Sequence, residues 1–170
     1  MPGTIIGCLG AQRSGKTLFA YKLVKLLHEV YDVPVYTNIY SPRDDFHYIN
    51  SLNDFPLDLT PKIMFIDEIY NGLDAQDFKK LKEISIFINT IGKQNCLFVY
   101  TTIEAEMVYN RLRNQTQLVV MVSKNEKNLY YKIVNLADMS ILSMLSQSMA
   151  SCLKTCIMIR SSYRLTLIGA

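Results

Sequence analysis

Residues 10–17 read GAQRSGKT and stand between an apolar segment and an amphipathic one. The preceding run, TIIGCL at 4–9, is apolar and rich in β-branched residues, which predicts a short strand buried on both faces. The following run, 17–31, repeats apolar residues every three or four positions and predicts an amphipathic helix. The eight residues match G-x-x-x-x-G-K-[ST], a pattern that requires a strand before it and a helix after it. A turn of this kind at the edge of a parallel sheet is therefore expected.

The residues of this turn have the chemistry of a phosphate-binding loop. Gly10 and Gly15 permit crowded backbone positions, so that successive N–H groups and the positive end of the helix face phosphate oxygens. Lys16 is expected to neutralise the β- and γ-phosphates, and Thr17 to place its hydroxyl on Mg²⁺. The predicted nucleotide-binding residues are Gly10, Ala11, Gln12, Arg13, Ser14, Gly15, Lys16 and Thr17. ATP and Mg²⁺ are the expected cofactors.

A second group of polar residues follows the apolar run IMFI at 63–66, which ends in Asp67 and Glu68. An acid at the carboxyl end of a buried parallel strand lies at the edge where such sheets bind ligands. Asp67 is therefore a candidate metal-site residue that holds a magnesium-bound water. Glu68 is a candidate catalytic base that orients or deprotonates a water for attack on the γ-phosphate. Tandem acids favour ATP hydrolysis over phosphate transfer to a small acceptor.

Further catalytic candidates follow the next apolar run. Thr101 and Thr102 end that run, and their hydroxyls are expected near the γ-phosphate, with plain strand termination as the alternative. Arg111 and Arg113 come next, on a predicted short helix. Either guanidinium is a candidate to reach a neighbouring subunit's γ-phosphate and stabilise transition-state charge; a solvated helix face is the alternative.

Strands and helices are expected to alternate along the chain. Strands are predicted over 4–9, 33–39, 63–66, 96–100, 118–122 and 129–134, and helices over 17–31, 77–90, 103–114 and 137–149, with a long polar segment over 40–61. The last two strands flank SKNEKN, which is typical of a hairpin. This order predicts an α/β fold with a mostly parallel central sheet and an antiparallel edge hairpin. One domain over 1–149 is expected, followed by a tail of unassigned role at 150–170.

Composition excludes several classes of protein. A chain of 170 residues fits one compact domain, and 49% hydrophobic with 19% charged residues excludes a disordered polymer. A formal charge of +3 is too small to prove a polyanion partner. The four cysteines lack zinc-ligand spacing and fit a reducing compartment. No signal peptide and no integral membrane segment is recognised, so a cytoplasmic location is expected.

The segments GAQRSGKT, IMFIDEI and CLFVYTTIEAEMVYNRLRNQTQLVVMV together resemble the FtsK–HerA branch of P-loop ATPases. The likeness is greatest to zonula-occludens-toxin-like and viral genome-packaging members, covers about residues 4–135 and includes the TNI after the second strand. It implies a three-layer P-loop NTPase fold of the RecA/ASCE-like kind. It also implies ATP and magnesium on Lys16, Thr17 and Asp67, with Glu68 as catalytic base.

The same resemblance implies a ring, with a hexamer favoured, that uses ATP hydrolysis to translocate, package or export double-stranded DNA. Arg111 or Arg113 would act between subunits of this ring. The branch commonly has Gln after the threonine pair, whereas this chain has Ile103, which leaves Thr102 as the substitute sensor. A virus or mobile element is the implied source, with host cytoplasm as the location and a virion or membrane-associated partner. Candidate DNA contacts are Lys79, Lys80, Lys82, Lys124 and Lys127.

Two other functions fit the motifs. A nucleoside or nucleotide kinase of the thymidine-kinase type also joins a phosphate loop to an Asp-Glu strand end, but its usual zinc ribbon of paired cysteines is absent from this sequence. A nucleotide-dependent assembly switch would bind ATP only to order subunits. One phosphate-release assay separates the three functions. DNA stimulation would indicate a motor, phosphate transfer to an added nucleoside a kinase, and nucleotide binding without turnover a switch.

Overall fold

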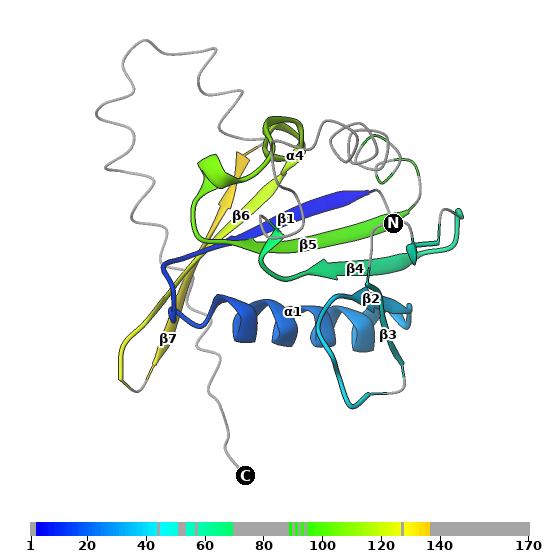
Figure 1. Cartoon of the computed structure of the whole chain (residues 1–170), viewed down its shortest axis with the longest axis horizontal. Helices are drawn as coiled ribbons and strands as arrows, with labels where there is room; N and C mark the ends of the chain where they lie inside the picture. Colours follow the sequence, from blue (N-terminus) through cyan, green and yellow to red (C-terminus); the bar gives the residue numbers. More distant parts are fainter. Residues whose placement is uncertain are drawn as a thin grey trace. The chain divides into compact units, whose positions relative to one another are not determined.

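The computed structural model describes residues 3–43, 45–50, 54–56, 58–69, 89, 91, 93, 95–126 and 128–136. Seven strands among these residues form one sheet in the order β3-β2-β4-β5-β1-β6-β7 (Figure 1). The strands are β1 Thr4–Leu9, β2 Val35–Thr37, β3 Phe46–Tyr48, β4 Lys62–Ile66, β5 Cys96–Thr102, β6 Leu118–Lys124 and β7 Leu129–Asn135. The helices that lie wholly within the described residues are α1 Lys16–Tyr31, the 3-10 helix η2 Ala105–Met107 and α4 Asn110–Gln115. All neighbouring strands in this sheet pair parallel except β6 and β7, so the predicted α/β sheet with an antiparallel edge hairpin is confirmed.

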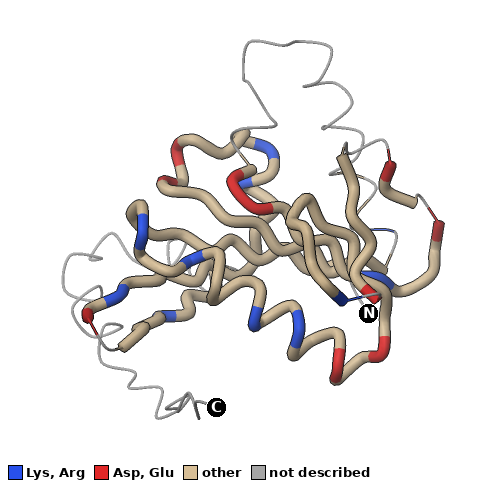
Figure 2. The backbone as a smooth tube through the Cα atoms, turned by 60° about the horizontal axis from the view of Figure 1, so that its bottom comes forward, with Lys and Arg blue, Asp and Glu red and all other residues tan. Residues whose placement is uncertain are grey.

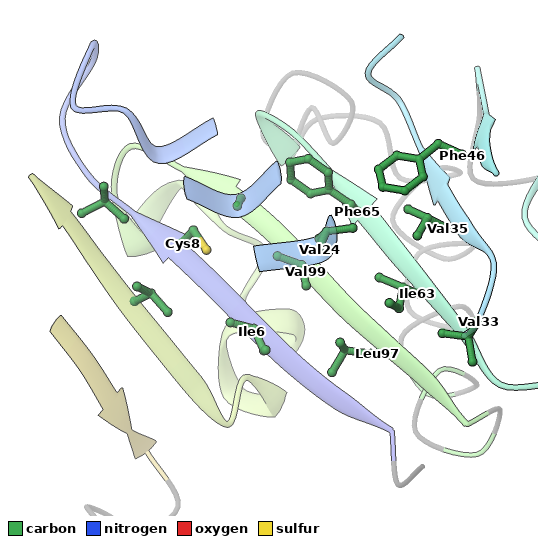
Figure 3. Packing of buried hydrophobic residues seen from close by; sticks show 13 residues of the cluster. Ile6, Cys8, Val24, Val33, Val35, Phe46, Ile63, Phe65, Leu97 and Val99 are labelled. Carbon is green, nitrogen blue, oxygen red and sulfur yellow. The ribbon is translucent and has the colours of Figure 1, made fainter. Parts of the chain in front are cut away.

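The sheet buries an apolar cluster on each face, because successive side chains of a strand point to opposite sides. On one face, Ala20 and Val24 of α1 pack with strand residues such as Val99 (Figure 3). The cluster on the other face includes Phe98 of β5 and Leu112 of α4. Figure 1 accordingly draws α1 and α4 on opposite sides of the sheet. Strands covered on both faces read as uninterrupted apolar runs, as β1, β4 and β5 do.

Two predicted elements depart most from their expected bounds, while the other predicted strands and α1 differ by at most two residues. β2 begins after Pro34, which has no N–H for the sheet; the Pro34 carbonyl still accepts a hydrogen bond from Ile63 N at 2.9 Å. The helix predicted over 103–114 is instead η2 followed by α4. Val108 and Tyr109 separate the two with ψ angles of 135° and 129°, which are extended values that a helix cannot continue through.

The segment predicted as polar over 40–61 contains a further strand, β3. Phe46 begins it and is buried, and β3 pairs parallel with β2, Val35 opposite Phe46. Only three residues long, and with exposed His47 and Tyr48 after Phe46, the strand lacks the apolar pattern that predicts one.

Several predictions lie outside the described residues. These are the helix at 77–90 apart from residue 89, the helix at 137–149, the tail at 150–170 with its boundary at 149, and the lysines Lys79, Lys80, Lys82 and Lys127. The chain divides into units 1–136 and 137–170, of which the second is not described. Among the described helices, none is long and apolar enough to cross a membrane.

The amino end of β4 carries a buried charge. Lys62 is fully buried, and its Nζ donates hydrogen bonds to the carbonyls of Pro56 and Asp58 at 2.8 and 2.9 Å and to the Asp58 carboxylate. The neighbouring ammonium is the main reason why the pKa of Asp58 is lowered to about 2. A buried ammonium is tolerated when it is paired and hydrogen-bonded in this way. This lysine therefore fastens the preceding loop to the sheet at the edge opposite the phosphate loop.

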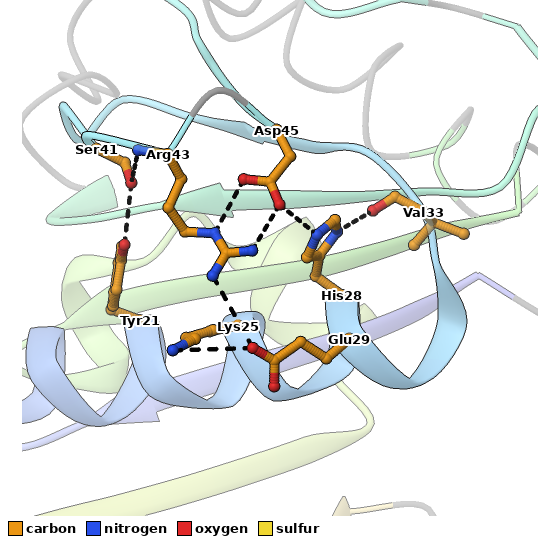
Figure 4. Close-up of polar contacts among 8 residues, drawn as sticks. All are labelled: Tyr21, Lys25, His28, Glu29, Val33, Ser41, Arg43 and Asp45. Atoms are coloured by element: carbon orange, nitrogen blue, oxygen red, sulfur yellow. Dashed lines mark hydrogen bonds and ion pairs between the residues drawn. The ribbon is translucent and has the colours of Figure 1, made fainter.

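A second polar network fastens the connection between β2 and β3 to α1 (Figure 4). Arg43 donates to both carboxylate oxygens of Asp45, at 2.9 and 2.6 Å. His28 of α1 lies 2.7 Å from Asp45 Oδ2 through Nε2 and 2.7 Å from the Val33 carbonyl through Nδ1. Bidentate guanidinium–carboxylate pairs are among the stronger polar contacts. Asp45 therefore joins Arg43 to His28 of α1, and Arg43 also lies 3.9 Å from Glu29 Oε1 of the same helix.

Asp45→Asn should lower stability at neutral pH more than in acid. The Arg43 guanidinium, with His28 as a further partner, holds the pKa of the Asp45 carboxyl well below its usual range. A carboxylate whose pKa is lower in the folded state contributes stability above its unfolded pKa of about 4, and that contribution is lost as the pH falls. Urea unfolding at pH 7 and pH 3 should therefore give a larger difference between wild type and variant at pH 7. Equal differences at both pH values would contradict this, and Glu104→Gln, an exposed carboxylate outside the network, is the control.

Candidate functional site

The turn between β1 and α1 has the backbone shape that the motif predicts. Gly15 has φ 85°, in the left-handed region that glycine adopts without strain. A Cβ at Gly15 would also lie 2.6 Å from Leu129 Cδ1 of the edge hairpin. Arg13 has φ 61°, which costs a non-glycine residue about 1–2 kcal/mol. The loop thus holds one strained residue and one position where only glycine fits.

Gly10 is constrained by close packing rather than by its φ angle. A Cβ at this position would lie 2.5 Å from the backbone oxygen of Val122 and 2.6 Å from Ser14 Oγ. Val122 belongs to β6, which runs parallel to β1. The edge hairpin therefore contacts both glycines of the loop, a reason for their presence additional to phosphate binding.

Two buried polar side chains in the loop have no partner. Lys16 is 6% exposed, and within the described residues its side chain has no hydrogen bond or ion pair. Ser14 is 8% exposed, and its Oγ is buried without a hydrogen-bond partner. A buried hydroxyl without a partner costs free energy that a bound anion with oxygen acceptors would recover, and such an anion would also pair with the Lys16 ammonium. The loop thus fits a phosphate group. Ala11 and Gln12, by contrast, are exposed.

The predicted metal-site residues meet directly. Thr17 Oγ1 donates a hydrogen bond of 2.9 Å to Asp67 Oδ1, although the two residues are 50 positions apart. Thr101 Oγ1 donates to the same oxygen at 2.6 Å. The sheet explains the meeting: β1, β4 and β5 are parallel neighbours, so Leu9, Ile66 and Thr102 end at the same edge.

The turn after β4 is strained and held from β5. Glu68 has φ 50°, which is uncommon outside glycine. Its backbone N–H donates to Thr101 Oγ1 at 2.8 Å. Thr101 thus accepts from the Glu68 backbone while it donates to Asp67, and it contacts both acids.

The structure brings Thr101, and not Thr102, to the acidic residues. Thr102 is fully buried, and its hydroxyl donates to the Glu104 carbonyl at 3.0 Å. Strand alternation explains the difference, because Leu97 and Val99 lie on the α1 face and Thr101 continues that series. Thr17 lies in the first turn of α1, on this same face of the sheet. Its hydroxyl and that of Thr101 therefore meet at Asp67 Oδ1. The sequence already contains this alternation, which could have identified Thr101 as the threonine that lies near the acids.

Arg111 and Arg113 are not brought to the loop of their own chain. Arg111 is exposed, and Arg113 Nη2 donates to Asn110 Oδ1 at 2.8 Å within α4. α4 lies on the sheet face opposite α1 and leads to Gln117, whose N–H bonds to Ile5 O near the amino end of β1. α4 therefore carries both arginines as the predicted short helix does, and their action on a neighbouring subunit stays a prediction.

Sequence reasoning did not assign a role to Asn38. This residue follows the last residue of β2, and its side chain bonds to both backbone polar groups of Asp67, at 2.8 and 3.0 Å. Its place in the TNI segment, at the carboxyl end of the predicted strand 33–39, was the available signal.

The oxygen donors at this edge suit magnesium. A hydroxyl and a carboxylate are hard ligands, and Mg²⁺ is commonly held by one or two carboxylates together with waters and substrate phosphates. Among the described residues, no group of three or more His, Cys, Asp or Glu side chains could hold a metal alone. Thr17 and Asp67 therefore fit an ion that arrives with a nucleotide better than a permanent all-protein metal site.

The two described cysteines supply no nucleophile to this edge. Cys8 and Cys96 are free and buried. Burial raises the pKa of each thiol to about 12, so the thiolate is absent at neutral pH. Both act as small apolar residues of the core, as predicted.

Solved structures with a similar fold are found, although no family model matches the chain and no curated protein matches it in sequence. The N-terminal domain of zonular occludens toxin from Neisseria meningitidis is 16% identical, with a TM-score of 0.54 over 78% of this chain and 84% of that one. The genome packaging NTPase B204 of Sulfolobus turreted icosahedral virus 2, in complex with sulfate, is 12% identical, with a TM-score of 0.58 over 81% and 94%. The KaiC-like protein PH0186 of Pyrococcus horikoshii is 16% identical, with a TM-score of 0.51 over 79% of each chain.

These likenesses concern the fold, since all three identities lie below 25%. The chain has the α/β fold of P-loop NTPases, and its predicted structural likeness to zonula-occludens-toxin-like and genome-packaging proteins is confirmed at that level.

Proposed function

We propose that this chain is a magnesium-dependent P-loop ATPase that acts as an oligomeric motor on double-stranded DNA. The hydrogen bond between Thr17 and Asp67 carries the proposal, because it joins the phosphate loop to the acidic strand end. The buried, unpaired Lys16 beside it supports a polyanionic ligand.

Binding is assigned to the loop. Its backbone N–H groups and the Lys16 ammonium contact the triphosphate, and the amino end of α1 adds its dipole. Ser14 Oγ gains an acceptor on binding. Thr17 and Asp67 are the residues that hold Mg²⁺, which neutralises phosphate charge during the reaction.

Hydrolysis is assigned to Glu68. Its carboxylate takes a proton from a water whose oxygen bonds to the γ-phosphorus, while the bond from that phosphorus to the bridging oxygen of ADP breaks. The products are ADP and inorganic phosphate. The left-handed backbone of Glu68, bonded to Thr101, supports a defined direction for this side chain. Thr102 is assigned a sensing role through the segment that its hydroxyl contacts.

The DNA and ring components rest on fold likeness. B204 is a genome packaging NTPase, and it has been solved with ATP-gammaS and with AMPPCP. Basic and acidic residues are spread over the described chain in short runs, such as Arg13, Lys16, Lys22 and Lys25 before Glu29 (Figure 2). DNA contact is therefore assigned to scattered groups such as the exposed Lys124 at the end of β6. A virus or mobile element as source, host cytoplasm as location, a hexameric ring and a virion or membrane-associated partner belong to the same proposal.

Phosphate release with and without double-stranded DNA tests the function. Lys16→Ala should abolish productive ATP binding, because the ammonium that offsets the phosphate charge is removed. Glu68→Gln should retain ATP and lower turnover by about 10²-fold or more, the scale of a missing general base. Lys22→Ala and Glu104→Gln alter exposed residues of the same types and should leave both quantities unchanged.

Other outcomes of this assay would contradict the proposal in different ways. Phosphate transfer to an added nucleoside would identify a kinase. Nucleotide binding without turnover would identify an assembly switch. If DNA does not stimulate turnover, the ATPase assignment stands and the assignment as a DNA motor fails. If Glu68→Gln keeps full activity, Glu68 is not the catalytic base.

Mixing subunits tests Arg111 and Arg113. An arginine that reaches a neighbour's γ-phosphate is worth about 10³–10⁵ in turnover, so Arg111→Ala or Arg113→Ala should be nearly inactive alone. Subunits with either change keep an intact Glu68 and should regain activity beside Glu68→Gln subunits, which keep the arginines. A mixture of Lys16→Ala with Glu68→Gln is the control, since both changes damage the same site and no recovery is expected. Absence of recovery for both arginine variants at every ratio would exclude an action in trans.

A further inference from the structure

We propose that Asn38 is a positioning residue of the metal site, which sets the backbone of Asp67 and through it the directions of both acids. This inference rests on the proposed function, since it concerns the same magnesium and nucleotide. Asn38 contacts neither ligand in the proposal and acts only through Asp67.

The contact uses the whole carboxamide group. Asn38 Oδ1 accepts a hydrogen bond from Asp67 N at 2.8 Å, and Asn38 Nδ2 donates one to Asp67 O at 3.0 Å. An amide side chain has a donor and an acceptor in one plane, which matches the two polar groups of a residue in an extended strand. Alanine and leucine offer neither group, and an aspartate at pH 7 offers only acceptors.

The amide continues the sheet beyond the strand. The parallel register of β2 and β4 ends with Thr37 opposite Phe65. Past that point the backbone of the β2 segment turns away through Ile39, whose N–H bonds to Thr37 Oγ1 at 3.2 Å. The Asn38 side chain takes the place of the missing ladder partner and satisfies the polar groups of Asp67, which would otherwise be left to water.

The Asp67–Glu68 turn is thereby held from both neighbouring strands. β4 lies between β2 and β5 in the sheet. Asn38 bonds to the turn from the β2 side, while Thr101 bonds to the Glu68 N–H and the Asp67 carboxylate from the β5 side. A left-handed residue such as Glu68 is strained and persists where surrounding bonds over-determine it.

Exposure separates this role from a general structural one. Asn38 is exposed, and a solvent-accessible hydrogen bond contributes little to folding because water replaces it in the unfolded chain. Its removal should therefore change global stability little. A small rotation of the Asp67 peptide, in contrast, moves the carboxylate that Thr17 contacts. Partners that orient metal ligands typically affect metal affinity or activity by about 10–100-fold.

The test measures metal dependence apart from nucleotide binding. Asn38→Leu removes both hydrogen bonds with a side chain of similar shape, and Asn38→Ala is the second variant in case leucine impairs folding. Affinity for a fluorescent ADP is measured in EDTA and over a magnesium titration, together with kcat and the thermal midpoint. We expect ADP affinity in EDTA to stay within about 2-fold, and half-saturating Mg²⁺ to rise and kcat to fall by about 10–100-fold.

Asn95→Ala is the matched control. Asn95 Nδ2 also bonds to a backbone carbonyl, that of Leu59 at 3.1 Å, but just before β5, at the amino edge of the sheet. Asn95 has φ 52°, so alanine there should lower the thermal midpoint without altering magnesium dependence.

The outcomes separate this proposal from the proposed function. If wild type hydrolyses ATP and both Asn38 variants keep its magnesium dependence, Asn38 has no positioning role and the ATPase assignment stands. If the variants lose stability alone, as Asn95→Ala should, the role is structural and the proposal is overturned. If wild type neither binds nor hydrolyses nucleotide, the proposed function fails and this inference fails with it.

Discussion

Two hydroxyl groups donate to one carboxylate oxygen, Asp67 Oδ1, and the organisation of this edge depends on that convergence. Thr17 comes from the start of α1 and Thr101 from the end of β5, so the oxygen joins three segments that are distant in sequence. A carboxylate that accepts such bonds is held in one direction without any cation present. The edge is therefore organised before a ligand binds, which lowers the cost of ordering it on binding.

The packing of the sheet makes this convergence possible. Parallel strands end at a common edge, and the apolar clusters on both faces fix which side of each strand faces α1. Asp67 continues the series Ile63 and Phe65 on the α1 face, as Thr101 continues Leu97 and Val99. A shift of one residue in the register of β4 or β5 would turn these polar groups to the α4 face. The apolar core thus determines the chemistry of the edge through strand alternation.

The edge hairpin adds a constraint on the loop that the motif itself does not contain. Val122 O approaches Gly10, and Leu129 approaches Gly15, so β6 and β7 limit the side chains that the loop can carry. The ring of Tyr131 on β7 also lies 5.0 Å from that of Phe19 on α1. The hairpin is therefore joined to the phosphate loop and to the first turns of its helix. A displacement of the hairpin would therefore shift the phosphate loop, and the reverse, because close-packed contacts transmit displacement.

The sequence by itself determined the parallel sheet, the turn at 10–17 and the meeting of that turn with Asp67, because buried strands and the phosphate-loop motif leave local patterns. Uninterrupted apolar runs predicted β1, β4 and β5 closely. Only the tertiary structure decided that Thr17 and Thr101 donate to the same oxygen of Asp67 and that Asn38 bonds to the Asp67 backbone. These depend on strand order and on which face each side chain meets, and strands far apart in sequence become neighbours only through packing. β3 was not predicted, for a related reason. Its three residues have one buried side chain and form a strand only because β2 lies beside them.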